Sequence, residues 1–422
     1  MDINSILKGV ECSCGKMHSC NIEYVYIEKN AVLRMTEICK DYNNILIVAD
    51  ENTFSAAGNS VEKVLENKKI NKVIFGGQRI LIPDEDAIKT VDEQLADVEL
   101  IIGIGSGVIQ DLCKYVSFFS GIPYMVVATA PSMDGYASDG AAMILKGMKE
   151  TVKAGLPKAI IADTEILKNA PMEMIKAGYG DIIGKYSALC DWKLSEAVNG
   201  EYFCQYIYDT TYDMIQSTLD TAKGLLERDE KSVKALMEAL IVVGIMMSFA
   251  GSSRPASGSE HHLSHFFEIV GIINSEPYFP HGIDVAYSTV VTAEIRENIL
   301  KKTFSDKLYR VSEDEYVGKM KEIYKNVADE CIALQNRVGN YTAERINVYK
   351  KKEAEIREIL AQMPKADEIK DMLSLAEIDV SEFYEMYGEK KIKDAVLYAK
   401  DLKDRYTVLW FNYDTGGGYK NE

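Results

Sequence analysis

The fold of this chain is decided by one stretch, Val98-Glu99-Leu100-Ile101-Ile102-Gly103-Ile104-Gly105-Ser106-Gly107-Val108-Ile109-Gln110-Asp111. Its apolar first half predicts a strand over 98–104 that is buried on both faces, and a helical pattern follows from Val108 to Phe119. Glycines in the turn let the backbone approach a ligand, and the helix directs its first N–H groups outward. The stretch therefore predicts a strand, a turn that can hold a pyrophosphate, and a helix. A tight turn without a ligand is the alternative, since the pattern differs from GxGxxG.

Further strands are predicted on both sides of this stretch. Short apolar runs, separated by amphipathic helical patterns, indicate strands over residues 21–26, 44–50, 72–75, 124–129 and 159–162. Strands that alternate with helices are typical of an open parallel sheet. Beyond Asp163 the strand patterns stop and long helical patterns follow. We therefore predict an α/β domain with a parallel, Rossmann-like sheet over residues 1–163, and an all-helical domain over residues 164–422.

A dense polar turn follows the strand predicted over 124–129. Its sequence is Thr129-Ala130-Pro131-Ser132-Met133-Asp134-Gly135-Tyr136-Ala137-Ser138-Asp139-Gly140. Hydroxyls, carboxylates and small side chains gather here, after a strand whose carboxyl end is where an α/β sheet binds ligands. The turn is therefore a candidate ligand site, and an ordinary surface loop is the alternative.

Four of the five histidines lie in the short segment from His261 to His281. His261 and His265 are four residues apart, so on a helix they share one face. The Pro280-His281-Gly282 corner can present a third imidazole from a turn. Histidine is the commonest metal ligand and the usual proton shuttle near neutral pH. Such a cluster in a histidine-poor chain favours a functional site over scattered surface histidines.

A carboxylate that can complement these imidazoles lies upstream, at Asp181. It follows Gly178-Tyr179-Gly180, which predicts a helix break with Asp181 in the first turn of the next helix. A simple helix cap is the alternative role. Together, Asp181, His261 and His281 would provide one carboxylate and two imidazoles. Such a set leaves positions open for substrate oxygens, as catalytic metal sites do.

Composition excludes several classes of function. The net charge of −17 argues against nucleic-acid binding, which needs a cationic face. No run reaches about 18 uninterrupted apolar residues, so we predict no membrane span. The N-terminus lacks a basic region followed by an apolar core, so we predict no secretory signal. Most of the eight cysteines are scattered, which favours reduced thiols and a cytoplasmic protein.

The exception among the cysteines is an N-terminal arm, Cys12-Ser13-Cys14-Gly15-Lys16-Met17-His18, with Cys20 close by. Cysteine and histidine at these intervals can hold zinc. The intervals differ from those of a standard zinc knuckle, and a loose arm of reduced thiols is the alternative.

Several motifs, in this order, resemble the iron-containing alcohol dehydrogenase and glycerol dehydrogenase superfamily, and within it the bacterial sn-glycerol-1-phosphate dehydrogenases. They are GIGSGVIQD at 103–111, TAPSMDGYAS at 129–138, GYGDIIGKYSALCDW at 178–192, SSRPASGSEHHLSH at 252–265 and PHG at 280–282. SRPAS followed by GSEHxxSH is specific for the glycerol-1-phosphate branch. The resemblance covers nearly the whole chain, although the helical region 313–365 is extended relative to the family. A homodimer is part of what it implies.

The resemblance also implies roles for individual residues. Asp181, His261 and His281 would bind a divalent metal, zinc or nickel, while Asp134 and His265, with Asp181, would contact the substrate. The pyrophosphate of NAD(H) or NADP(H) would lie on Gly105, Ser106, Gly107, Val108 and Ile109. The nicotinamide would lie along Thr129, Ala130, Pro131, Ser132 and Ser138. Asp50 would meet the adenosine ribose, and its charge favours NAD(H) because it repels a 2′-phosphate.

The implied activity is reduction of dihydroxyacetone phosphate to sn-glycerol 1-phosphate. We expect Arg254, and after it Lys185, to bind the substrate phosphate; surface ion pairs are the alternative role for both. His265 is a candidate for the proton relay to the product oxygen. Three other functions remain open: a dehydrogenase of unphosphorylated polyols, a lyase like dehydroquinate synthase, and a binding protein without catalysis.

Overall fold

The computed structural model describes residues 3–78, 81–146, 148–304 and 307–417. Two compact units are present. The first consists of Met1–Ile182 and Gln216–Ser253, and the second of Ile183–Ile215 and Arg254–Glu422. Helices α8 (Met172–Asn199) and α9 (Gln205–Leu226) run through both units without interruption. The last strand does end at Asp163, where helix α7 follows, but a domain boundary at this point stays a prediction.

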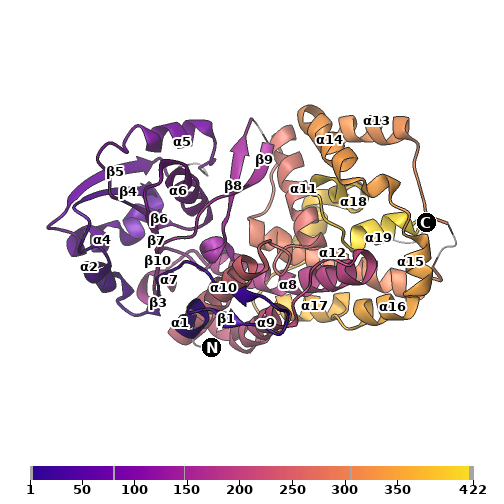
Figure 1. Ribbon diagram of the computed structural model, residues 1–422, viewed down its shortest axis with the longest axis horizontal. Coiled ribbons are helices and arrows are strands. Elements are labelled where there is room, and N and C mark those ends of the chain that lie inside the picture. Colours follow the sequence, from indigo (N-terminus) through magenta and orange to yellow (C-terminus); the bar gives the residue numbers. More distant parts are fainter. Residues whose placement is uncertain (1–2, 79–80, 147, 305–306, 418–422) are drawn as a thin grey trace. The chain divides into compact units, whose positions relative to one another are not determined.

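The first unit contains a six-stranded parallel sheet, as the sequence predicts (Figure 1). Its order is β3-β10-β7-β6-β4-β5, and every neighbouring pair is parallel. The strands are β3 (Tyr24–Glu28), β4 (Asn44–Asp50), β5 (Lys69–Phe75), β6 (Leu100–Gly105), β7 (Tyr124–Ala128) and β10 (Ala159–Asp163).

The strand order reverses beside β4. The chain proceeds from β4 to the edge strand β5 and then returns to place β6 on the other side of β4. In open α/β sheets, ligands bind at such a reversal, beyond the carboxyl ends of the strands. The glycine turn after β6 and Asp50 at the end of β4 therefore lie at the expected position for a nucleotide.

The central strands are buried because their alternate side chains enter two different cores. Ile45, Ile47 and Ala49 of β4 pack on one face with residues of α2 (Met35–Ile38) and α4 (Asn59–Val64). Leu46 and Val48 pack on the other face with α5 (Glu85–Asp92) and α6 (Gly107–Ser120). Burial on both faces is the reason that these strands have nearly continuous apolar sequences.

Two short antiparallel hairpins and a short N-terminal helix complete the strand-containing part of the chain. They are β1 (Val10–Glu11) with β2 (Met17–His18), β8 (Gly140–Leu145) with β9 (Met148–Lys153), and α1 (Ile3–Leu7). The structure also has a short π-helical segment, Phe54–Gly58, between α3 (Glu51–Thr53) and α4. Residues 51–64 thus form three consecutive helical pieces.

Helices follow β10 to the end of the described chain, as predicted. They are α7 (Thr164–Leu167), α8, α9, α10 (Glu230–Ala250), α11 (Ser259–Asn274), α12 (His281–Lys301), α13 (Glu313–Tyr324), α14 (Ala328–Val338), α15 (Ile346–Lys351), α16 (Glu353–Ala361), α17 (Ala366–Ser374), α18 (Ser381–Tyr398) and α19 (Val408–Asp414). By length and composition α10 could cross a membrane, but 72% of its most apolar window is buried in the protein, as in the core helix of a globular domain. The absence of a membrane span stays a prediction.

The predicted helix break at Gly178-Tyr179-Gly180 is wrong. Helix α8 continues from Met172 to Asn199, so Asp181 lies within the helix and does not begin one. A Cβ atom at Gly178 would lie 1.9 Å from the carbonyl oxygen of Pro131. Glycine is required here because the helix approaches another backbone, and the sequence pattern of a break and of a close approach is the same.

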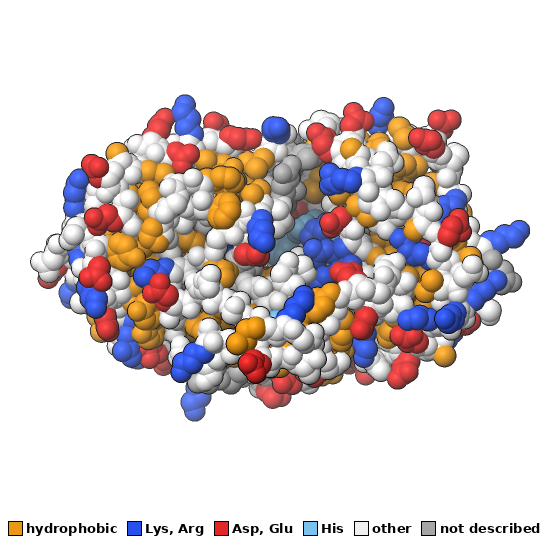
Figure 2. Space-filling model, in the orientation of Figure 1, with side chains coloured by type: hydrophobic (Ala, Val, Ile, Leu, Met, Phe, Trp, Pro, Cys, Tyr) orange, Lys and Arg blue, Asp and Glu red, His pale blue; other side chains and the backbone are white. Residues whose placement is uncertain are grey.

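The surface carries charges of both signs. On the face shown in Figure 2, acidic and basic side chains are interspersed. The excess of acidic residues in the sequence is therefore not gathered on that face into one large patch.

Candidate active site

Three imidazoles of the second unit form one cluster. His261 and His265 lie one turn apart on α11, as their spacing predicts, and His281 is the first residue of α12. The ring centroid of His281 lies 5.0 Å from that of His261 and 5.6 Å from that of His265. His261 and His265 are 6.0 Å apart. Helices α11 and α12 thus bring together residues 20 positions apart in sequence.

His261 is held in one orientation by Glu260. The Nδ1 atom of His261 lies 2.7 Å from Oε1 of Glu260, and both side chains are buried. Burial is the main reason that the pKa of His261 is well below its usual range. A neutral imidazole that donates from Nδ1 presents the lone pair of Nε2 to a metal. Burial, reinforced by the charge of Asp191, raises the pKa of Glu260 to about 8.

Asp181 is fixed by the polar turn that follows β7. Its Oδ2 atom accepts a 3.0 Å hydrogen bond from the backbone N–H of Asp134, and the side chain is fully buried. Asp134 was predicted from the turn after a strand and Asp181 from a helical motif. The two residues lie together in the first unit.

Two side chains of α6 hold the polar turn in place through hydrogen bonds. Neither was predicted from the sequence as a site residue. Lys114 is fully buried and donates to the carbonyl oxygens of Gly140 (2.7 Å) and Gly135 (3.1 Å). Its ammonium nitrogen lies 3.4 Å from the Ser138 hydroxyl. Gln110 donates to the Gly135 and Tyr136 carbonyls. Polar residues on an otherwise apolar helix stripe were the available signal. Thr129, Ser132 and Ser138 are themselves buried.

The glycine turn connects β6 to α6 with little space for side chains. A Cβ atom at Gly105 would lie 2.7 Å from the Ile109 side chain, which is too close for any other residue. Gly107 is the first residue of α6, a helix of 14 residues. The first N–H groups of such a helix, together with its dipole, form a favourable site for an anion. A pyrophosphate site at this turn stays a prediction.

Asp50 ends β4 and begins the next helix. Its Oδ1 atom accepts a 2.8 Å hydrogen bond from the Thr53 backbone, and its own N–H donates to the Thr53 hydroxyl at 3.0 Å. This capping box holds the carboxylate at the carboxyl edge of the sheet, beside β6.

The cations near the histidines differ from those expected to bind phosphate. Arg254 is buried, and its guanidinium donates to the Glu201 carboxylate (Nε to Oε1, 2.6 Å) and to the Tyr406 carbonyl (2.8 Å). Lys185 is also buried and donates to the Ala256 carbonyl at 3.1 Å. Both predicted phosphate ligands therefore make internal hydrogen bonds. A direct contact of either residue with phosphate stays a prediction.

Two half-buried cations near the C-terminus were not predicted as site residues. Arg405 donates to the Ser257 carbonyl at 2.9 Å, and the Lys403 ammonium lies 3.4 Å from the Ser257 hydroxyl. Their positive charges contribute to the low pKa of His261, after burial, Lys185 and His281. Burial and the neighbouring Arg254 lower the pKa of Arg405 to about 10. Cations that repel one another in this way provide an electrostatic setting that favours an anion.

Comparisons with known proteins support the same interpretation. A family model described as iron-containing alcohol dehydrogenase matches residues 26–171. The chain is 32% identical over 337 residues to the glycerol-1-phosphate dehydrogenase [NAD(P)+] of Geobacillus thermodenitrificans, covering 78% of this chain and 83% of that protein. It is 30% identical over 411 residues to the enzyme of the same name from Bacillus licheniformis, covering 94% and 90%.

Solved structures extend the likeness to the fold. The iron-containing alcohol dehydrogenase of Thermococcus thioreducens aligns with a TM-score of 0.62 at 13% identity, covering 96% of this chain and all of that one. A likeness at this identity shows the fold alone. The sequence matches cover most of both chains, and with the shared fold they show that the chain belongs to the glycerol-1-phosphate dehydrogenase family of the iron-containing alcohol dehydrogenases.

Proposed function

We propose that this protein is a metal-dependent oxidoreductase that reduces dihydroxyacetone phosphate to sn-glycerol 1-phosphate with NADH or NADPH, and catalyses the reverse oxidation. The observation that carries the proposal is the cluster of His261, His265 and His281, in a unit that also holds Lys403 and Arg405. Imidazoles suit a divalent metal, and the cations suit a phosphate ester. The named relatives are glycerol-1-phosphate dehydrogenases.

We propose Asp181, His261 and His281 as the metal ligands. Each of the three residues offers one ligand atom, and within the second unit the ring centroids of His261 and His281 lie 5.0 Å apart. One carboxylate and two imidazoles fit zinc or nickel and leave positions open for substrate oxygens. When bound, the metal polarises the C2 carbonyl of the substrate and lowers the pKa of the C2 alcohol in the reverse direction.

The residues of the chain supply binding, orientation and proton transfer. Glu260 holds the His261 ring through Nδ1, and the Asp134 backbone holds the Asp181 carboxylate. His265, half-buried beside both other rings, is the candidate that delivers a proton to the C2 oxygen. Asp134 is proposed to contact the substrate hydroxyls from the polar turn.

For the phosphate we propose Arg405 with Lys403 as direct ligands. The carboxylate of Glu201 already accepts from Arg254, which favours a positioning role for Arg254. Because Arg254 donates to the Tyr406 carbonyl, it holds the segment that carries Arg405. A planar guanidinium can bind two phosphate oxygens at once.

We propose that the cofactor binds at the carboxyl ends of three neighbouring strands, β4, β6 and β7. The pyrophosphate lies on Gly105–Ile109, the nicotinamide along Thr129–Ser132 and Ser138, and the adenosine ribose at Asp50. Support comes from the adjacent positions of β4, β6 and β7 in the sheet. The Asp50 carboxylate favours NADH, and Asp50→Ser is expected to raise the kcat/KM ratio of NADPH to NADH. On the family resemblance alone we also propose a cytoplasmic homodimer, which analytical ultracentrifugation tests for its oligomeric state.

The deciding experiment is NADH oxidation by zinc- or nickel-reconstituted protein with dihydroxyacetone phosphate, run beside dihydroxyacetone. We expect turnover with the phosphate ester and a chiral assay that identifies sn-glycerol 1-phosphate. Turnover with dihydroxyacetone alone would move the protein to the polyol dehydrogenases. No turnover with either substrate in either metal would contradict the proposed activity.

A further inference from the structure

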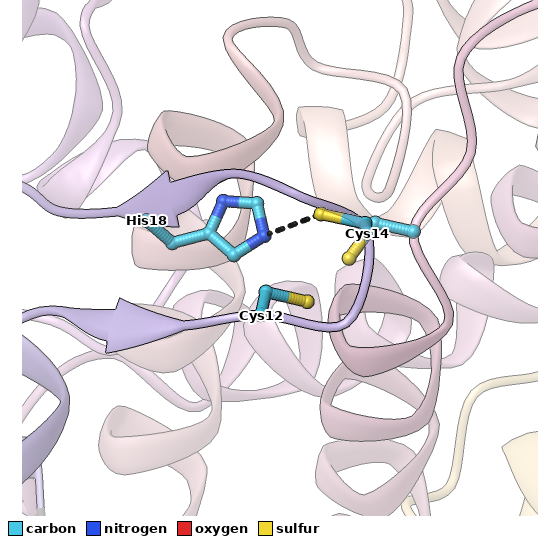
Figure 3. A group of neighbouring side chains, drawn as sticks. Cys12, Cys14 and His18 are labelled. Carbon is cyan, nitrogen blue, oxygen red and sulfur yellow. Dashed lines mark hydrogen bonds between the residues drawn. The ribbon is translucent and has the colours of Figure 1, made fainter.

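The N-terminal hairpin forms a compact group of thiols and one imidazole. Strands β1 and β2 pair through Val10 with His18 and Glu11 with Met17. The turn between them closes with hydrogen bonds from Cys12 N–H to the Lys16 carbonyl (3.1 Å) and from Gly15 N–H to the Cys12 carbonyl (3.0 Å). Gly15 has a φ of +84°, which favours glycine. The turn folds Cys12 and Cys14 back beside His18 (Figure 3).

The sulfur–nitrogen distance within this group matches that of a zinc site. Zinc–sulfur bonds of about 2.3 Å and zinc–nitrogen bonds of about 2.0 Å, at tetrahedral angles, place sulfur and nitrogen about 3.5 Å apart. The Sγ atom of Cys14 lies 3.4 Å from Nε2 of His18 (Figure 3). The ligand atoms of Cys12, Cys14 and His18 all lie within 4.8 Å of one another.

The imidazole is held in place independently of any metal. His18 is 2% exposed, and its ring stacks on Phe249 with a centroid distance of 5.2 Å and an interplanar angle of 12°. A ring fixed in this way presents Nε2 to the thiols without further loss of side-chain freedom. Cys12 and Cys14 are present as thiols and not as disulfides.

We propose that Cys12, Cys14 and His18 bind a zinc ion, separate from the metal of the active site. Two thiolates and one imidazole form a sulfur-rich set, whereas Asp181, His261 and His281 offer only oxygen and nitrogen. On binding, the two thiols release their protons to solvent and the sulfurs become zinc ligands. The ion would hold the turn of the N-terminal hairpin closed against His18.

The first test is the metal content of the full-length protein, measured by inductively coupled plasma mass spectrometry after zinc loading and desalting. We expect about two zinc ions per chain for the wild type and about one for Cys14→Ser and for Cys12→Ser. His281→Ala is expected to keep the thiolate-bound ion and lose the other. Cys331→Ser, which changes a buried cysteine outside the group, is the matched control and should keep both ions.

The second test uses the wild-type protein, so its outcome does not depend on whether a variant folds. Cobalt(II) substitution of the wild type should produce the intense thiolate-to-cobalt charge-transfer bands of a tetrahedral sulfur-rich site, which imidazole and carboxylate ligands do not produce. Absence of these bands, unchanged zinc content in Cys14→Ser, or a Cys12–Cys14 disulfide that persists in protein loaded with zinc under reducing conditions would overturn the proposal. Failure of dihydroxyacetone phosphate turnover would not, because that result concerns the other metal site.

Discussion

Replacement of Gly178 by alanine is expected to separate helix α8 from the turn that follows β7. A Cβ atom at this position would lie 1.9 Å from the Pro131 carbonyl oxygen, and real Cβ atoms are essentially never closer than 3.0 Å to such a neighbour. The two backbones must therefore move apart by about 1.1 Å. Asp181 lies almost one turn later on the same helix. The 3.0 Å hydrogen bond from the Asp134 amide to Asp181 would lengthen to about 4.1 Å and be lost.

Alanine at position 178 has two opposing effects on the free energy of unfolding, and the steric destabilisation is larger than the gain in helix propensity. Alanine is a better helix former than glycine by about 1 kcal/mol. Overpacking costs about 1–3 kcal/mol, and loss of a hydrogen bond to a charged group costs about 1.5–3 kcal/mol. We expect Gly178→Ala to lower the free energy of unfolding by about 1.5–5 kcal/mol. Turnover should fall as well, because the Asp181 carboxylate is displaced.

Urea denaturation followed by circular dichroism measures the loss of stability. The initial rate with dihydroxyacetone phosphate measures the loss of turnover. The control is Gly318→Ala in α13, where an added Cβ meets no atom within 4 Å. This control should gain about 0.5–1 kcal/mol from helix propensity alone. A Gly178→Ala protein as stable as the wild type would refute the reasoning.

Three further predictions concern the active site and the core of the helical unit. Arg405→Ala should raise KM for dihydroxyacetone phosphate by about 10–100-fold and leave the weak rate with dihydroxyacetone unchanged, since one bidentate ionic contact is worth about 1.5–3 kcal/mol; equal losses on both substrates would contradict phosphate binding. His281→Ala should abolish binding of the active-site metal, as measured by isothermal titration with nickel, while the far-ultraviolet circular dichroism spectrum is retained. Burial raises the pKa of Asp284 well above its usual range, even though Tyr387 donates to both of its oxygens (2.8 and 2.9 Å). A raised folded-state pKa disfavours the charged form, so the wild type should lose stability relative to Asp284→Asn as pH rises above about 4, by about 1.4 kcal/mol per unit of pKa difference. A stability difference that is the same at pH 5 and pH 8 would show that Asp284 does not titrate in this way.

The sequence by itself determined the sheet and its strands. The run Asn44–Asp50 was predicted as a strand and is β4, because a strand buried on both faces needs an unbroken apolar sequence, which is a local property. The spacing of His261 and His265 likewise predicted one helix face, since helix periodicity depends only on separation along the chain. The glycine turn after β6 was placed correctly for the same reason.

Only the tertiary structure decided which distant groups meet. Glycines mark both helix breaks and close approaches, and the nearness of Pro131 to Gly178 selects the second. Arg254 pairs with Glu201, which lies 53 residues earlier in the chain, and no spacing rule predicts this pair. Partners of this kind are selected by three-dimensional packing and by the free-energy cost of burying an unpaired charge or polar group, and neither quantity can be evaluated before the segments are placed.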